Sequence, residues 1–153
     1  MQQLNLPTYE FKWKKTGDGL CIFDELRKKF LVLTPEEWVR QNLVRYLVED
    51  KNFPGGMISL EAGLKLNKLQ KRYDVLVYSK QGTPLVLIEC KAPSVKITQK
   101  VFEQILAYNI TIKAPHLIVS NGLSHFFLSK NKAETFEFQK EIPEYKEISQ
   151  QSA

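Results

Sequence analysis

The chain has 153 residues, of which 43% are hydrophobic and 25% are charged, and its 22 Lys and Arg outnumber its 17 Asp and Glu to give a formal charge of +5. A chain of this length can bury a full core as one domain, so it needs no disulfide framework or structural metal to fold. Its Gly, Pro and aromatic contents exclude collagenous, wholly disordered and coiled-coil classes. A pI near 9.1 indicates an anionic partner.

The cysteine and hydropathy patterns bear on the compartment. Two cysteines, Cys21 and Cys90, with His116 and His125 as the remaining soft ligands, make a zinc site improbable and fit a reducing cytoplasm. The first lysines follow a polar stretch rather than precede an apolar run, so we expect no signal peptide. No window approaches the roughly 18 apolar residues of a membrane span, so we expect no contact with a membrane.

The first segment, residues 1–33, is predicted to be an N-terminal arm packed on the core. It contains two extended runs, Tyr9–Trp13 and Phe30–Leu33, on either side of a turn at Thr16–Gly19. Gly17 and Gly19 in that turn favour a change of chain direction. We therefore expect a short β extension ahead of the core.

A helix start follows at once. Thr34 is typical of an N-cap, Pro35 of the first helical position, and Glu37 completes a capping box. We expect this helix to end near Glu49, because the Asn52–Gly56 stretch contains Pro and two Gly.

The rest of the chain alternates between strand and helix patterns. Three extended segments, the last two joined by a turn containing Gly82, are predicted at Met57–Leu66, Tyr73–Tyr78 and Leu85–Cys90. Helical spacing of apolar side chains predicts a second helix over Thr98–Lys113. Shorter strands are predicted at His116–Val119, His125–Leu128 and Thr135–Phe138. The order of helix, three-stranded meander, helix and strand predicts an α/β core over residues 34–140, with a mixed central sheet covered on both faces. We expect extra strands at both ends of this core and a polar C-terminal tail at 141–153.

Candidate catalytic residues lie at the end of the most apolar strand. The run Leu85–Ile88 indicates a buried central strand, and alternation places Glu89 and Lys91, which follow it, on one face. If the two preceding strands form a hairpin, Asp74 falls beside Glu89, because both lie near its far end. A salt bridge at the rim of the sheet is the alternative interpretation.

Two carboxylates and a lysine at such a place suit metal-assisted phosphodiester hydrolysis. Mg²⁺ prefers oxygen ligands and commonly uses one or two carboxylates, so Asp74, Glu89 and the backbone carbonyl of Cys90 are the candidate ligands. Lys91 would orient or help deprotonate the attacking water, which the metal activates. The Cys90 side chain points to the other face of the strand, where we expect it to be a core residue.

The arrangement Tyr73-Asp74 followed by Glu89-Cys90-Lys91 between two helices resembles the PD-(D/E)xK nuclease superfamily, although Tyr73 replaces the Pro of that motif. More narrowly, the chain resembles the N-terminal nuclease domain of type I restriction enzyme R subunits over roughly residues 33–128. The stretches that carry this resemblance are Thr34–Gln41, Arg72–Asp74, Pro84–Lys91, Gln104–Asn109 and Ser120–Gly122.

The resemblance implies a restriction-endonuclease-like core and a Mg²⁺-dependent DNA endonuclease, with Mn²⁺ as a substitute metal and Asp74, Glu89 and Lys91 as the catalytic set. R subunits continue into a helicase-like translocase, and 153 residues without a Walker-type glycine loop contain none. We therefore expect separate restriction or translocase subunits, or a stand-alone nuclease. A double-strand break needs two active sites, which a homodimer would supply.

The two predicted helices offer further candidates. Glu36 lies near the apolar stripe of the first helix and is the better choice over Glu37 for a carboxylate reaching the metal, or it simply complements the helix dipole. Gln104 and Tyr108 have the Gln-x-x-x-Tyr spacing that resembles a motif of RecB-like nucleases, where it supports the site or contacts DNA. Tyr108 also lies on the apolar stripe of its helix, so a core role is the alternative.

Basic side chains flank the proposed catalytic residues on both sides in sequence. They could neutralise DNA phosphates or simply be solvated, and they are Lys65, Lys68, Lys71, Arg72, Lys96 and Lys100. Glu61 is either an additional acidic neighbour or a rim charge, and the two histidines are interpreted as structural. Two other functions stay open: a catalytically weak nuclease fold that binds DNA or a restriction or translocase partner, and an RNA or repair nuclease.

Overall fold

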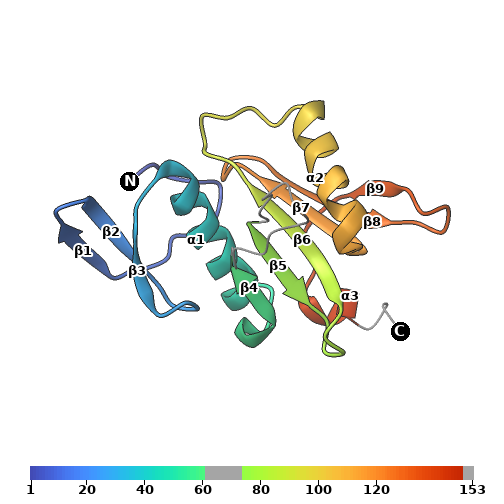
Figure 1. The fold of residues 1–153 in the computed structure, drawn as a ribbon, viewed down its shortest axis with the longest axis horizontal. Coiled ribbons are helices and arrows are strands. Elements are labelled where there is room, and N and C mark those ends of the chain that lie inside the picture. Colours follow the sequence, from blue (N-terminus) through green and yellow to red (C-terminus); the bar gives the residue numbers. More distant parts are fainter. Residues whose placement is uncertain (61–73, 150–153) are drawn as a thin grey trace.

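Helix α1, Pro35–Glu49, lies between two β-sheets (Figure 1). The computed structural model describes residues 1–60 and 74–149. Thr34 caps α1, because its hydroxyl oxygen accepts a hydrogen bond of 3.0 Å from the Glu37 amide, as the sequence predicts. Val39, Leu43 and Leu47 are fully buried and recur at helical spacing, so this face of α1 packs on the core. Every helix in the described ranges is too short or too polar to cross a bilayer.

The N-terminal segment forms a three-stranded antiparallel sheet in the order β1-β2-β3. Its strands are Trp13–Thr16, Gly19–Asp24 and Lys29–Val32. The predicted turn at Thr16–Gly19 is confirmed, but β1 begins where the first predicted run ends, and the central strand β2 was not predicted. The sheet packs on α1 through Trp13, whose ring lies 5.9 Å from that of Trp38. Ile22 on the central strand β2 is fully buried.

The main sheet has six strands in the order β4-β5-β6-β7-β8-β9. The strands are Ile58–Leu60, Val75–Tyr78, Pro84–Cys90, His116–Ser120, His125–Lys130 and Phe136–Gln139. Strands β6 and β7 are parallel, whereas the other neighbours are antiparallel. The predicted meander and mixed sheet are confirmed, although a 3-10 turn, η1 at Gly55–Met57, delays the start of β4.

The helices cover opposite faces of this sheet, as predicted. Residues of α1 share a core with Val75, Val77, Val86 and Ile88. Helix α2, Gln99–Ile112, packs on the other face, where Leu76, Leu87 and Leu117 lie. Alternation along β5 and β6 therefore divides the apolar side chains between two cores.

The predicted polar tail is wrong for residues 141–149. A short helix, α3 at Tyr145–Ser149, follows β9, and Ile142, Tyr145 and Ile148 are buried in the core on the α1 side. The Tyr145 hydroxyl donates a hydrogen bond of 3.0 Å to the Tyr78 carbonyl, which fixes α3 against the end of β5. This packing depends on three apolar side chains spaced three residues apart. The charged residues around them made the segment look like a polar tail in the sequence.

Gly122 occupies a position in the β7–β8 turn that favours glycine. Its φ is +86°, and an added Cβ would lie 2.7 Å from a methyl group of Leu4. We predict that Gly122→Ala lowers the free energy of unfolding by about 1–3 kcal/mol, because a non-glycine residue is strained in this conformation. Urea unfolding measures the effect, with Gly17→Ala as a control, since nothing lies within 4 Å of that position. Equal stabilities of the two variants would contradict the prediction.

Candidate active site

Strands β5 and β6 bring Asp74 and Glu89 together. Val75 pairs with Ile88 in the antiparallel register, so Asp74 and Glu89 follow as neighbours at the same end of the hairpin. One carboxylate oxygen of Asp74, Oδ2, accepts a hydrogen bond of 2.8 Å from the Cys90 amide. The hairpin inferred from the sequence thus juxtaposes the two carboxylates, and the backbone of β6 fixes one of them.

Lys91 extends from the end of β6 beside Glu89. Its backbone amide donates a hydrogen bond of 2.8 Å to the Ser120 carbonyl, which extends the parallel pairing with β7. Its Nζ lies 3.2 Å from Glu89 Oε1. Burial alone would lower the pKa of Lys91, but Glu89 and then Asp74 outweigh it and raise that pKa. Lys91 is therefore held as a cation beside the two carboxylates.

Glu89 has the most perturbed carboxylate of the group. Burial, followed by repulsion from Asp74, raises its pKa to about 7, and the nearby Lys91 opposes that rise. Glu36 also contributes to the rise and has a raised pKa itself, owing to burial and then to Asp74. The charge of Asp74, which directly precedes β5, is therefore close enough to oppose the ionisation of Glu36 on α1 and Glu89 on β6.

Glu36 and Glu37 have different surroundings, although they are adjacent. The Glu36 side chain is 46% exposed and faces the candidate site, with Oε1 at 3.4 Å from Arg40 Nη2. Glu37 is buried, and its carboxylate pairs with Arg40 and accepts a hydrogen bond of 2.7 Å from Gln41. The expectation that the Glu37 carboxylate completes a capping box is corrected, because two buried donors on α1 engage it instead. Its amide still bonds to Thr34.

Arg40 is a residue of the site that sequence reasoning missed. Its side chain is 9% exposed, and its guanidinium bridges Glu37 to Asp74, with Nη2 at 3.0 Å from Asp74 Oδ1. Burial would lower the pKa of Arg40, but Glu37 and Asp74 outweigh it and raise that pKa. Arg40 follows Glu36 by four residues and Glu37 by three, and this helical spacing was the available signal.

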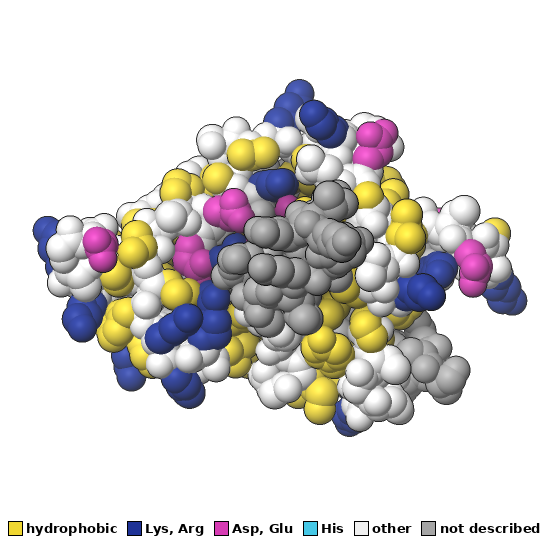
Figure 2. Space-filling view, in the orientation of Figure 1, with side chains coloured by type: hydrophobic (Ala, Val, Ile, Leu, Met, Phe, Trp, Pro, Cys, Tyr) yellow, Lys and Arg dark blue, Asp and Glu magenta, His cyan; other side chains and the backbone are white. Residues whose placement is uncertain are grey.

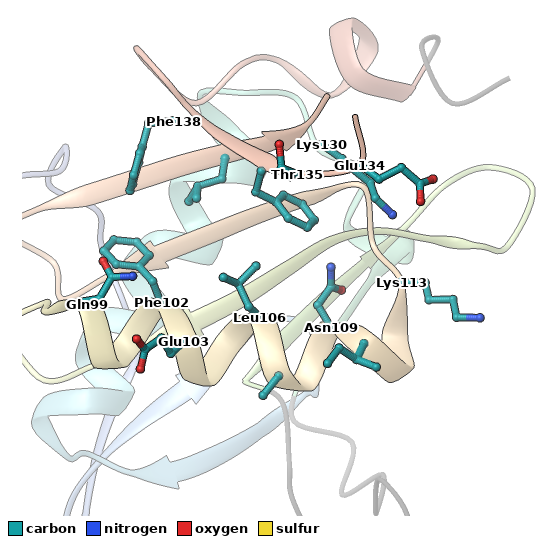
Figure 3. A pocket seen from close by; sticks show the side chains of 14 residues that line it. Gln99, Phe102, Glu103, Leu106, Asn109, Lys113, Lys130, Glu134, Thr135 and Phe138 are labelled. Carbon is teal, nitrogen blue, oxygen red and sulfur yellow. The ribbon is translucent and has the colours of Figure 1, made fainter. Parts of the chain in front are cut away.

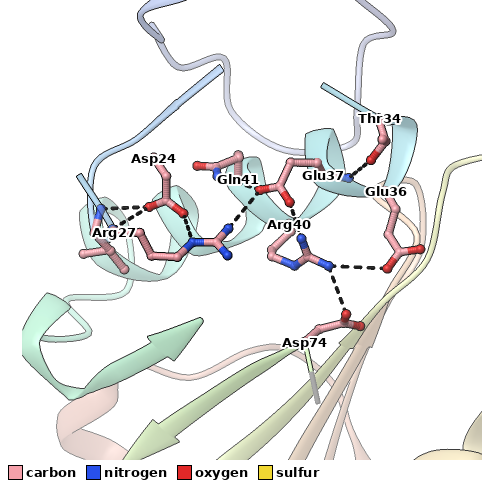
Figure 4. A network of polar contacts seen from close by, with 9 residues as sticks. Asp24, Arg27, Thr34, Glu36, Glu37, Arg40, Gln41 and Asp74 are labelled. Atoms are coloured by element: carbon pink, nitrogen blue, oxygen red, sulfur yellow. Dashed lines mark hydrogen bonds and ion pairs between the residues drawn. The ribbon is translucent and has the colours of Figure 1, made fainter. Parts of the chain in front are cut away.

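The ionic network continues from Arg40 into the N-terminal sheet (Figure 4). Arg27 Nη2 lies 3.4 Å from Glu37 Oε2, and Arg27 Nε lies 2.6 Å from Asp24 Oδ2. Asp24 ends β2 and is buried, and its carboxylate also accepts hydrogen bonds from the turn before β3. A chain of alternating charges therefore connects the N-terminal sheet to Asp74.

The remaining predicted residues lie around this cluster or outside the described ranges. Cys90 is fully buried on the opposite face of β6, as expected, and burial raises the pKa of its thiol. Tyr108 on α2 packs partly on the core, and burial followed by the charge of Glu89 raises the pKa of its hydroxyl, so this residue both contacts the core and lies near Glu89. Gln104, Lys96 and Lys100 are exposed. The candidates outside the described residues are Glu61, Lys65, Lys68, Lys71 and Arg72.

The two histidines lie in structural contacts. His116 stacks on Phe127 with ring centroids 5.5 Å apart, and burial lowers its pKa to about 4. His125 Nδ1 shares a hydrogen bond of 2.7 Å with the Ser120 hydroxyl. Both contacts link strands of the main sheet or its turn and involve none of the carboxylates described above.

The donor set at the end of β6 fits a hard cation of the Mg²⁺ type. Asp74 and Glu89 supply carboxylate oxygens, and their mutual repulsion is the kind of charge excess that a divalent cation relieves. Among the described residues, no group of three or more His, Cys, Asp and Glu side chains is arranged to enclose a metal. Mg²⁺ needs fewer protein ligands, because it retains waters and takes substrate phosphate oxygens.

A groove elsewhere on the molecule has a different character. It has a volume of about 1040 Å³ and lies between α2 and the β8–β9 hairpin (Figure 3). Its wall includes Phe102, Leu106 and Phe138, with charged side chains at its edges. None of the carboxylates at the end of β6 lines it, so this groove is separate from the candidate site.

The raised pKa of Glu89 predicts a pH-dependent stability. Between its ordinary pKa of 4.5 and the folded value of about 7, the folded protein holds a proton that the unfolded chain has lost. Stability therefore falls as pH rises through this window. We predict that Glu89→Gln is more stable than the wild type by on the order of 2 kcal/mol at pH 8 without metal, and that the difference shrinks by pH 5.

Thermal unfolding across this pH range measures the difference. Glu103→Gln, at an exposed position of α2, is the matched control and should track the wild type at every pH. A constant offset between Glu89→Gln and the wild type from pH 5 to pH 8 would show that the Glu89 carboxylate is not destabilised in the fold.

Comparisons with known proteins agree with this fold. The family model for the type I restriction enzyme R protein N terminus matches residues 35–143. A solved fragment assigned as an HsdR subunit of a type I restriction enzyme from Vibrio vulnificus YJ016 is similar, with a TM-score of 0.58, 16% identity and 78% of this chain covered. This chain spans 25% of that one. A search of curated proteins finds no match. Because the family model covers most of the chain, the protein belongs to the family of type I restriction enzyme R protein N-terminal domains.

Proposed function

We propose that this domain is a Mg²⁺-dependent DNA endonuclease of restriction type, with Asp74, Glu89 and Lys91 as its catalytic residues. The observation that carries the proposal is the pairing of Asp74 with Glu89 at one end of the β5–β6 hairpin, with Lys91 Nζ 3.2 Å from Glu89. The raised pKa of the Glu89 carboxylate beside a second carboxylate and a cation is typical of functional sites rather than of surface ion pairs.

Asp74, Glu89 and the Cys90 carbonyl would hold the metal. A bound Mg²⁺ supplies Lewis-acid stabilisation of the phosphate and lowers the pKa of water. Glu36 projects from the first turn of α1 toward the same carboxylates, and it would act as an outer acidic ligand. Since the side chain of Glu36 is partly exposed, it is accessible to a substrate-bound cation in a way that the buried Glu37 is not.

Lys91 would bind the scissile phosphate and orient the attacking water. Its side chain is 26% exposed, so the ammonium is open to a substrate while it stays paired with Glu89. The raised pKa of Lys91 keeps it protonated at neutral pH, which suits charge neutralisation of the phosphate better than proton abstraction. Tyr108, which lies close enough to Glu89 to feel its charge, would support this side of the site.

The DNA backbone would contact basic side chains around the site. Lys and Arg side chains lie over the N-terminal sheet and at the start of α2 on one face of the molecule (Figure 2). The exposed Lys96 precedes α2 and the exposed Lys100 lies in its first turn, where they would neutralise phosphates. The family match further supports a place in a type I restriction assembly, with restriction or translocase subunits as partners, or a homodimer for double-strand cleavage.

Three substitutions test the catalytic assignment. We predict that Asp74→Asn, Glu89→Gln and Lys91→Met each lower the DNA cleavage rate with Mg²⁺ by at least about 10²-fold. The first two remove a charge that would hold the metal, and the third removes the cation at the phosphate. DNA affinity in EDTA should change little, since these residues contribute to the transition state more than to backbone binding. Gel assays of plasmid nicking and fluorescence anisotropy measure the two quantities.

Glu103→Gln and Lys132→Met, at exposed positions outside the cluster, are the matched controls and should cleave like the wild type. If the wild type binds DNA and cuts no substrate with Mg²⁺ or Mn²⁺, the protein is instead a binding module with a nuclease fold. If RNA or branched DNA is the preferred substrate, the restriction assignment is wrong while the catalytic residues stand.

Metal binding should depend on pH in a defined direction. Since Glu89 holds its proton up to about pH 7, a cation that binds its carboxylate must displace that proton. We predict that Mn²⁺ raises the melting temperature at pH 8 by several degrees and has little effect at pH 5.5, and that EDTA reverses the shift. Differential scanning fluorimetry measures it. An equal shift at both pH values, or an undiminished shift in Glu89→Gln, would exclude Glu89 as a ligand.

A further inference from the structure

The structure points to Arg40 as the positioning residue for Asp74, with Glu37 and Arg27 holding Arg40 in place. This inference rests on the proposed function, because Asp74 is the proposed metal ligand. It goes further by assigning a role to buried charges that touch neither metal nor substrate. It also makes the N-terminal sheet part of the catalytic apparatus.

Asp74 is held by one donor on each carboxylate oxygen. Arg40 Nη2 binds Oδ1 at 3.0 Å, and the Cys90 amide binds Oδ2 at 2.8 Å. Together these two bonds fix the rotation of the carboxylate about its own axis. An ionised carboxylate accepts about four hydrogen bonds, so each oxygen keeps a lone pair for a metal.

Arg40 has the geometry that this role needs. Its Nη1 pairs with Glu37 and its Nη2 with Asp74, so one planar guanidinium connects α1 to the β5–β6 hairpin. The side chain is 9% exposed, and little solvent competes for these bonds. A lysine would keep the charge but lose the planar set of N–H donors, because a single ammonium does not hold two carboxylates in a fixed plane.

Glu37 and Arg27 restrict Arg40 in turn. Glu37 accepts from Arg40 through Oε1, and its Oε2 is engaged by Gln41 at 2.7 Å and by Arg27 at 3.4 Å. Arg27 is anchored by Asp24 at the end of β2. The orientation of Asp74 therefore depends on a strand of the N-terminal sheet as well as on α1.

The experiment replaces Arg40 by lysine and uses Arg45→Lys as a matched control. Both arginines lie on α1, and Arg45 contacts the Glu10 carbonyl and the ring of Phe11 rather than Asp74. Because the charge is conserved in both variants, any difference between them reports geometry. Three quantities are measured: hydrogen exchange of the Cys90 amide in EDTA, Mn²⁺ affinity by calorimetry, and the kcat and KM of DNA cleavage.

We expect Arg40→Lys to speed exchange of the Cys90 amide, to weaken Mn²⁺ binding by about 10-fold to 100-fold and to lower kcat by a similar factor, with KM for DNA unchanged. Arg45→Lys should match the wild type in all three. A purely structural role would lower stability without this split between kcat and KM. If Arg40→Lys does not fold, Glu37→Gln provides the test, because it loosens Arg40 without altering Asp74, and its Cys90 amide should also exchange faster.

Unchanged Cys90 exchange in folded Arg40→Lys, or Mn²⁺ affinity and kcat equal to those of Arg45→Lys, would overturn the inference. Failure of the proposed function has a different signature. In that case the wild type cleaves no DNA, whereas the metal-free exchange difference between the two lysine variants persists and still supports Arg40 as the group that orients Asp74.

Discussion

The repulsion among three carboxylates at the end of β6 is the constraint on which the rest of the candidate site depends. Glu36, Asp74 and Glu89 come from three different parts of the chain, and burial, followed by the charge of Asp74, raises the pKa of both Glu36 and Glu89. Charges withdrawn from water need compensation nearby, or the fold loses stability. Arg40 and Lys91 provide this compensating positive charge. The register of β5 against β6 and the packing of α1 on the sheet bring both cations close to the carboxylates.

Arg40 is more deeply buried than Lys91, and this difference in burial suits the two cations to different roles. Arg40 is buried and engaged on both sides, so it is suited to hold Asp74 and not to meet a substrate. Lys91 is partly open and faces the end of the sheet where a phosphate would arrive. The family match begins at residue 35, whereas Arg27 and Asp24, which complete the ionic chain, precede it. A domain boundary drawn at the family match would therefore cut through the network that supports Asp74.

Much of the fold follows from local chemistry and was predictable. Thr34 and Pro35 start α1 because capping is a local interaction, and the apolar run of β6 indicates a central strand wherever it occurs. The missed elements depend on distant partners. Strand β2 is stabilised by pairing on both edges and by burial of Ile22. Helix α3 is ordered because Ile142, Tyr145 and Ile148 are buried in the core on the α1 side. Neither of these stabilising contacts can be inferred from a short window of sequence.

The candidate site divides in the same way. The sequence by itself determined that Asp74, Glu89 and Lys91 lie together at one end of the sheet, because their proximity follows from strand alternation and from the pairing of two strands in a hairpin. Only the tertiary structure decided how they are held. The link from Asp74 to Arg40 joins residues 34 positions apart, and the link from Glu37 to Arg27 crosses between a helix and a separate sheet. Ion pairs within one helix have a helical spacing, but those between different elements have no sequence period, so their partners are set by packing.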